Sequence, residues 1–232
     1  MNFLFKLYKF SLPETVCRIL HRLRIISVKH TFQIFIKELE HHKPQSIVEM
    51  DGLSIILREL FEQELEKLEY SAGMHSIETL REHFAYGSRF FAAFCENKVI
   101  ALGELNTQIA QLTYIRMSEV RLPQNFVYLN SGFVAPEYRS QGIGTALTNY
   151  IQGIAKIEGH RMALLVTLPE NFGAICWHYA NGFQKWGEIT YLRWNGRDLW
   201  WKHLTKAGRR YAHILDQAET RQQTQAVLEK VS

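Results

Sequence analysis

Residues 134–144, Val-Ala-Pro-Glu-Tyr-Arg-Ser-Gln-Gly-Ile-Gly, constrain the fold of this 232-residue chain more than any other segment. The preceding residues 126–134 are rich in aromatic and β-branched side chains and predict a strand, which Pro136 ends because proline lacks the N–H that a ladder needs. Apolar residues then recur at helical spacing, at Ile143, Leu147, Tyr150, Ile151 and Ile154. Gly159 provides a left-handed stop. The sequence therefore predicts a glycine loop between a strand and the start of a helix.

Such a loop suits a phosphate group. The first N–H groups of a helix have no acceptor within the helix, and the helix dipole is positive at that end. Gly142 and Gly144 leave room for a diphosphate beside the backbone, and Arg139 adds a charged donor. No Gly-x-x-x-x-Gly-Lys-Ser/Thr occurs, and Leu147 occupies the place of the third glycine of a dinucleotide fingerprint. A short glycine loop taken alone also fits an ordinary strand-to-helix turn.

Two motifs in succession resemble the GNAT superfamily of N-acetyltransferases. The segment from Arg139 to Gly144 is similar to the family motif Arg/Gln-x-x-Gly-x-Gly/Ala. The second family pattern, Asn-x-x-Ala-x-x-x-Tyr-x-x-x-Gly-Phe, is matched except at its Tyr by Asn171, Ala174, Gly182 and Phe183. The resemblance covers roughly residues 53–194. It implies an α/β (α+β) fold whose central sheet is mixed and mostly antiparallel, splays at a cofactor cleft and is flanked by helices.

The resemblance also implies acetyl-CoA as the acyl donor, lying in the opening of the sheet. The pantetheine arm would pair with the backbone near Phe133 and Val134, in the manner of an added strand. Asn171 would contact this arm or shape its pocket. The diphosphate would be bound by the loop residues Arg139, Ser140, Gln141, Gly142, Ile143, Gly144 and Thr145.

The acid that protonates the leaving thiolate is the first catalytic group to place. The family commonly has a Tyr seven residues after the motif Asn, whereas this chain has His178 there and Tyr179 next. A histidine with a pKa of about 6.5 could supply that proton near neutral pH. In the alternative interpretation His178 packs against the sheet, and Tyr179 or water acts instead.

The second catalytic group to place is the general base, which takes a proton from the attacking amine. Many relatives carry a Glu on the strand before the glycine loop, but this strand offers Asn130 and Ser131. Glu104, on a predicted strand at 99–105, is the alternative carboxylate, with a solvated charge at the strand end as the competing interpretation. A water oriented by Asn130 or Ser131 could also relay the proton.

Composition bounds the remaining possibilities. A chain of this length with 47% hydrophobic residues can bury one full core. Three cysteines without metal or redox spacing predict free thiols in a reducing compartment, hence a cytoplasmic protein, and no His or Cys cluster predicts a metal site. No apolar run reaches the roughly 20 residues of a membrane span.

Charge and periodicity divide the chain into three parts. Residues 1–46 form a basic extension with an amphipathic helix at 16–26 and an extra strand at 31–39. Residues 47–195 form the acetyltransferase-like domain, with helices at 62–70 and 77–84 and a hairpin of 90–95 with 99–105. Residues 196–232 form a C-terminal amphipathic helix that Asp198 can cap.

Partners follow from the two ends of the chain. The basic helix packs on the protein body in the favoured interpretation, with peripheral membrane contact through residues 1–30 left open. No recognition motif supports nucleic-acid binding. The apolar stripe of the C-terminal helix fits packing within the domain or a homodimer.

The function predicted on these grounds is acetyl transfer from acetyl-CoA to a primary amine of an unidentified acceptor, by direct attack in a ternary complex. Two alternatives remain. One is a non-catalytic GNAT-like module that binds CoA or docks on a membrane or partner. The other is an acyltransferase with a different acyl or aminoacyl donor.

Overall fold

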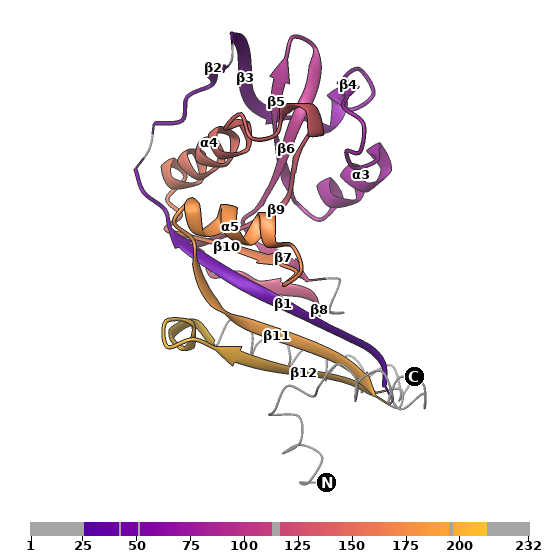
Figure 1. Ribbon diagram of the computed structural model, residues 1–232, viewed down its shortest axis with the longest axis vertical. Coiled ribbons are helices and arrows are strands. Elements are labelled where there is room, and N and C mark those ends of the chain that lie inside the picture. Colours follow the sequence, from indigo (N-terminus) through magenta and orange to yellow (C-terminus); the bar gives the residue numbers. More distant parts are fainter. Residues whose placement is uncertain (1–25, 42, 51, 113–116, 195–196, 213–232) are drawn as a thin grey trace.

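A large sheet determines where the other elements lie. The computed structural model describes residues 26–41, 43–50, 52–112, 117–194 and 197–212, and its strands form a ten-stranded sheet and a separate two-stranded one (Figure 1). The main path of the large sheet runs through β12 (Arg197–Leu204), β11 (Gln184–Trp194), β1 (Ile26–Glu38), β10 (Met162–Thr167), β9 (Phe126–Val134), β6 (Lys98–Asn106), β5 (Arg89–Cys95), β3 (Leu53–Leu60) and β2 (Ile47–Met50). Short β4 (Glu69–Tyr70) pairs with β6.

The sheet is mixed and mostly antiparallel, which confirms the predicted fold class. Parallel pairing joins only β9 with β10 and β4 with β6 among the described strands. The predicted hairpin is β5 with β6, and β3 pairs antiparallel with the other edge of β5. The separate two-stranded sheet consists of β7 (Ile109–Leu112) and β8 (Met117–Arg121), which pair antiparallel.

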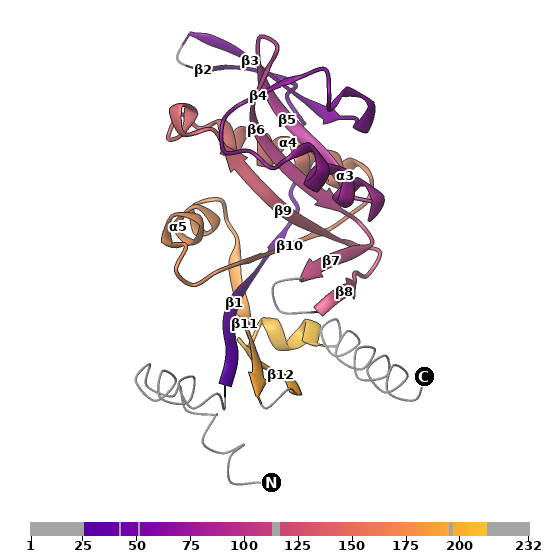
Figure 2. The same ribbon diagram turned by 90° about the vertical axis from the view of Figure 1, so that its right-hand side faces the viewer.

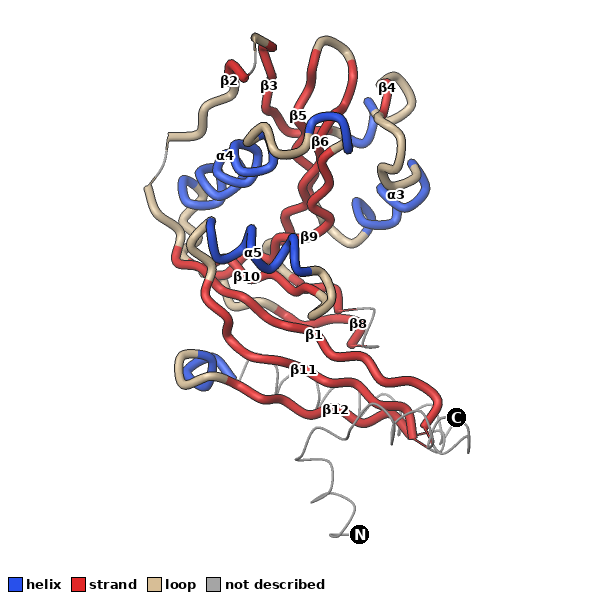
Figure 3. Tube along the Cα trace, viewed as in Figure 1, coloured by secondary structure: helices blue, strands red, loops and turns tan. Residues whose placement is uncertain are grey.

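Helices cover both faces of the sheet. On one face α4 (Ile143–Ile157) packs Leu147 and Ile151 against a core that includes Ala101 of β6. On the other face α3 (Ile77–Ala85) buries Leu80 beside Leu102, the next residue of β6. Figure 3 shows these two helices on opposite sides of β5 and β6. Alternation along the strand therefore assigns consecutive side chains to different cores.

The third helix, α5 (Phe172–Ala180), lies on the face that α4 covers. Its Ile175 packs against the same core, which includes Phe35 of β1. Figure 2 shows α5 on the opposite side of the molecule from α3. The predicted helix at 77–84 is confirmed as α3, capped by the Ser76 side chain. The helix predicted at 62–70 is wrong: only Glu62–Glu64 forms a single 3-10 turn, because residues 69–70 pair with β6 instead.

The strand predicted at 31–39 is β1, and it lies inside the sheet. It pairs antiparallel with β10 on one side and with β11 on the other. Phe35 and Leu39 are fully or almost fully buried in the core beneath α4. Residues 26–38 are thus part of the same sheet as the family-like region. A domain boundary at residue 46 stays a prediction, and the basic helix predicted at 16–26 lies outside the described residues except for Ile26.

The helix predicted from Asp198 is wrong for residues 197–204, which form β12. This strand pairs with β11 over its whole length, and Trp200 and Leu204 pack against the core around Trp186. A spacing of four residues places side chains on one face of a strand as well as of a helix, which explains the error. The next residues of that predicted helix form a turn and the 3-10 helix Gly208–Tyr211. Residues 213–232 lie outside the described residues, so the homodimer stays a prediction.

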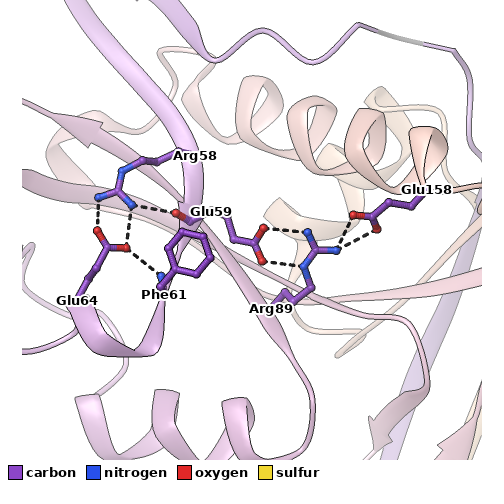
Figure 4. A network of polar contacts seen from close by, with 6 residues as sticks. All are labelled: Arg58, Glu59, Phe61, Glu64, Arg89 and Glu158. Carbon is purple, nitrogen blue, oxygen red and sulfur yellow. Dashed lines mark hydrogen bonds and ion pairs between the residues drawn. The ribbon is translucent and has the colours of Figure 1, made fainter.

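A network of ion pairs fixes the carboxyl end of α4 to the sheet (Figure 4). Arg89 of β5 donates two hydrogen bonds to Glu59 of β3, at 2.7 and 2.9 Å, and two to Glu158, at 2.8 and 2.9 Å. Nearby, Arg58 pairs in the same two-pronged manner with Glu64. Because Glu158 caps α4, the network holds the end of the helix remote from the glycine loop.

Candidate active site

Two parallel strands separate beside the glycine loop. β9 and β10 pair only from Phe126 opposite Met162 to Tyr128 opposite Leu164. Beyond Tyr128, β9 continues along β6 while β10 continues along β1. Within the described chain, residues 129–134 therefore have a strand partner on one edge only. This is the splay that the resemblance implied, and it leaves backbone groups available to an extended ligand.

A β-bulge lies in the separated part of β9. Leu102 of β6 is opposite Phe133 and Glu104 is opposite Asn130, so three steps along β9 correspond to two along β6. The extra residue bends the strand and changes the direction of nearby side chains. Asn130 and Ser131, two of the predicted catalytic residues, are at this bulge. Phe133 and Val134, predicted to pair with pantetheine, follow it.

The glycine loop forms the start of α4, as predicted. Gly142 is the N-cap at φ +84° and makes no side-chain cap, and Ser140 before it also has a positive φ of 62°. The first hydrogen bond of the helix runs from the Ala146 N–H to the Gly142 carbonyl, at 2.9 Å. The N–H groups of residues 143–145 consequently have no acceptor within the helix. Glycine adopts the left-handed conformation at position 142 without steric cost.

The other loop residues shape this turn. Arg139 Nε donates to the Val134 carbonyl at 2.9 Å, and Gln141 Nε2 donates to the Glu137 carbonyl at 3.1 Å. A methyl group added at Gly144 would be 3.2 Å from Val134 Cγ2. Gly144 therefore permits the start of α4 to approach the end of β9 closely. The two side chains brace the loop, while its backbone remains the group suited to an anion.

Helix α5 contacts the start of α4 through a residue that sequence reasoning missed. Trp177 Nε1 donates to Thr145 Oγ1 at 3.2 Å. Asn171 caps α5, with Oδ1 accepting from the Ala174 N–H at 3.2 Å. The structure thus gives Asn171 a local role in starting the helix that presents Trp177. Only the position of Trp177 inside the second motif could have drawn attention to it.

His178 packs against the sheet. Its side chain is 8% exposed, and its ring centroid is 5.1 Å from that of Phe35 and 5.9 Å from that of Phe183. Burial lowers its pKa to about 4, so the imidazole is neutral at pH 7. A neutral, buried ring disfavours the role of cationic proton donor. Tyr179 is 52% exposed and lies edge-on to Phe35, with centroids 5.4 Å apart.

Glu104 is buried, not solvated. Its carboxylate is 2% exposed and accepts from Ser88 Oγ at 2.6 Å and from Asn130 Nδ2 at 3.0 Å. His83 Nδ1 lies 3.0 Å from the same oxygen that Ser88 contacts. The structure thus brings two predicted catalytic residues, Glu104 and Asn130, into contact. Sequence reasoning missed Ser88 and His83, because neither belongs to a recognisable motif.

The Glu104 cluster and the glycine loop lie on opposite faces of the sheet. A methyl group at Gly103 would point at Ile151 of α4, so the next side chain, Glu104, faces α3. The single-sided edge of β9 lies between them. The loop and the cluster therefore approach that edge from different faces, an arrangement in which an anionic ligand and a second reactant can meet without competing for space.

The sequence matches the acetyltransferase (GNAT) family over residues 55–183, more than half of the chain. The protein belongs to this family. A conserved protein of unknown function from Staphylococcus epidermidis is similar in structure, with a TM-score of 0.48 and 9% identity over 79% of this chain and 67% of that chain. A GCN5-related N-acetyltransferase from Sphaerobacter thermophilus has a TM-score of 0.47 and 13% identity to this GNAT protein. The match covers 82% of this chain and 59% of that chain.

An aminoglycoside 6′-N-acetyltransferase from Acinetobacter baumannii is also similar, with a TM-score of 0.41 and 21% identity over 56% of this chain and 90% of that chain. No curated protein sequence matches significantly. The described residues hold no group of three His, Cys, Asp or Glu side chains that could bind a metal ion. None of the described helices has both the length and the apolar composition needed to cross a membrane.

Proposed function

We propose that this GNAT protein transfers an acetyl group from acetyl-CoA directly to a primary amine. Membership of the acetyltransferase family supports the reaction class. The observation that carries the proposal is the separation of β9 from β10 immediately before a helix start with N–H groups lacking intrahelical acceptors. An extended pantetheine arm and a diphosphate need these two features side by side.

The donor would occupy the glycine loop and the edge of β9. The amides of residues 140–145 would bind the diphosphate, with Arg139 adding positive charge at the surface. The backbone at Phe133 and Val134 would pair with the pantetheine arm. This arrangement would place the thioester near the bulge at Asn130 and Ser131. Asn171 would support the site indirectly by capping α5.

The reaction requires a neutral amine, a stabilised oxyanion and a proton for the thiolate. In the proposed site the amine nitrogen attacks the thioester carbon, a C–N bond forms, and the C–S bond breaks. Glu104 places a negative charge on the α3 face beside Asn130, which favours an incoming ammonium group. Tyr179 and His178 on α5 stay candidates for protonating the thiolate, and the neutral state of His178 favours Tyr179.

Binding is tested by thermal unfolding with acetyl-CoA. Ligand at 100 times its Kd stabilises a protein by about 2.7 kcal/mol, which corresponds to a rise in Tm of about 5–11 °C at this chain length. Gly142→Asp adds a negative charge to the loop, whereas Gly142→Asn adds a side chain of the same shape without charge. Both Asp and Asn tolerate a left-handed conformation, and among the described residues the added Cβ would meet only Met50, at 3.6 Å.

A charge about 6 Å from the diphosphate costs about 1–3 kcal/mol per unit charge, so Gly142→Asp weakens binding about 5-fold to 150-fold more than Gly142→Asn. Equal affinities for the two variants would contradict binding of the diphosphate at this loop. A wild-type Tm that does not respond to acetyl-CoA would overturn the proposed donor.

Turnover separates the remaining alternatives. Thiol release from acetyl-CoA with a panel of polyamines, amino sugars and peptide amines identifies an enzyme. Tight binding of CoA without release across that panel favours a non-catalytic module. Faster release from another acyl-CoA favours a different donor. Peripheral membrane contact through residues 1–30 is tested by vesicle binding before and after deletion of residues 1–25, which precede β1.

A further inference from the structure

Glu104 is poorly placed to take a proton from a substrate itself. Its side chain is 2% exposed, and both carboxylate oxygens already accept hydrogen bonds from protein groups. Its neighbours Ser88 and Asn106 are equally buried, and the Asn106 amide donates to Ser88 Oγ at 3.2 Å. His83, at 20% exposed, is the more accessible member of the Glu104–His83 pair.

The contacts of Glu104 determine the protonation of His83. Ser88 and Asn130 contribute hydroxyl and amide donors, which match an ionised carboxylate. A carboxylate can only accept, so the proton of a neutral His83 ring is on Nδ1, which lies 3.0 Å from Oε1. Nε2 then carries the lone pair. No hydrogen bond to Nε2 is found among the described residues, so this atom is available to accept a proton.

We propose that His83 Nε2 is the general base of the acyl transfer, and that Glu104 is a positioning residue that orients the ring and stabilises its protonated form. This inference rests on the proposed function. As the amine nitrogen bonds to the thioester carbon and the C–S bond breaks, the proton of the attacking nitrogen passes to Nε2. The thiolate takes a proton from solvent, either directly or through one of the α5 candidates Tyr179 and His178, and the imidazolium returns its proton to solvent. The products are an amide and a free thiol.

The surroundings of His83 suit a base that alternates between neutral and charged forms. Within the described part of the chain, the charged groups that interact with His83 are Glu104 of β6 and Glu82 of its own helix. The ring lies in the last turn of α3, where the helix dipole favours a cation. Phe90 of β5 packs 6.2 Å from the ring, between centroids. The hydrogen bond to Glu104, more than the general field of the two carboxylates, raises the pKa of His83 above 6.5.

His83→Asn is the sharpest variant. The Asn amide nitrogen can occupy the place of Nδ1 and keep the donor to Glu104, while the atom corresponding to Nε2 is lost. Positioned general bases contribute about 10²–10⁴-fold, so kcat/KM should fall at least 100-fold with the Kd for acetyl-CoA unchanged. His203→Asn, at an exposed position on β12, is the matched control and should leave both constants unchanged.

The pH profile distinguishes His83 from Glu104 as the base. In the wild type kcat/KM should rise with pH through a value above 6.5, because only the neutral ring accepts a proton. Glu104→Gln removes the cause of the raised pKa, so the rise should move to lower pH. If Glu104 were the base, His83→Asn would keep kcat/KM within about threefold, and that outcome would overturn the inference while leaving the proposed function intact.

A second measurement does not depend on finding the acceptor. The ¹⁵N NMR spectrum of the wild-type protein at a pH above the titration of His83 reports which ring nitrogen carries the proton. We expect the Nδ1–H form, changing to the other tautomer or to a mixture in Glu104→Gln. A neutral His83 protonated on Nε2 would contradict the inference even if acetyl transfer is found. Absence of turnover with every amine would instead overturn the proposed function.

Discussion

The fit of α4 against β6 depends on the missing side chain at Gly103. A methyl group there would lie 2.7 Å from Ile151 Cδ1, well inside van der Waals contact, and 3.8 Å from Leu147 Cδ2, which is an ordinary distance. Overpacking of this kind costs about 1–3 kcal/mol, and the lower backbone entropy of alanine in the unfolded chain returns about 0.4–1 kcal/mol. We therefore expect Gly103→Ala to destabilise the protein by about 1–2 kcal/mol.

Ile151→Val removes the atom that the new methyl group would meet. Alone it should cost about 0.5–1.5 kcal/mol by leaving a small cavity. In the double variant the methyl group added at position 103 fills that cavity, so the two changes together should cost about 1–2 kcal/mol less than their sum. Guanidinium unfolding followed by circular dichroism measures all four proteins. Additivity within about 0.5 kcal/mol would refute the contact between Gly103 and Ile151.

The same cycle tests how the glycine loop is positioned, because α4 begins at Ile143. A methyl group that displaces the helix from β6 also displaces its amino end relative to β9. The affinity for acetyl-CoA should therefore fall in Gly103→Ala and recover in the double variant. Affinity that stays low in the double variant, despite recovered stability, would separate the loop position from the helix packing.

His178→Phe should make the stability of the protein less dependent on pH in the acid range. The pKa of His178 is about 4 in the folded protein and about 6.5 in the unfolded chain, so the wild type loses stability as the pH falls from 6.5 to 4. Tm values of both proteins at pH 7 and pH 5 check this. Phe35→Ala should cost about 3–5 kcal/mol, because the ring is fully buried, and the matched Thr31→Ala about 1 kcal/mol, as denaturant unfolding would show. Arg89→Met should lower stability by about 1–2 kcal/mol, an effect that shrinks at high salt, whereas Arg81→Met at an exposed pair should change Tm little.

Local signals were enough to predict the donor side of the site. The glycine loop, the strand before it and the helix after it all follow from residues adjacent in sequence, and their structure is as predicted. The hairpin of β5 and β6 also follows from two apolar runs with a short polar turn between them. In each case the partner of a residue lies nearby along the chain, so periodicity and turn residues suffice.

Two of the errors share one cause, which is pairing with a distant segment. Glu69 and Tyr70 look helical by their neighbours, yet their backbone pairs with Lys98 and Val99. Glu104 looks like a strand-end charge, yet it is buried and accepts hydrogen bonds from Ser88, directly before β5, and from Asn130 of β9. The contact between His83 and Glu104 could not be predicted from the sequence for the same reason, because only the fold brings the two residues together.

The position of β1 inside the sheet determines when this strand can pair with its neighbours during synthesis of the chain. β1 is the first described strand to be synthesised, but its neighbours on both sides come near the end of the chain, and Thr31 and its hydrogen-bonded partner Thr190 are 159 positions apart. A nascent chain on the ribosome must carry this apolar strand without a partner until residues 162–194 emerge. Completion of the sheet therefore waits for translation, and the slow closure of so long a loop leaves the apolar side chains of β1 exposed to aggregation until then.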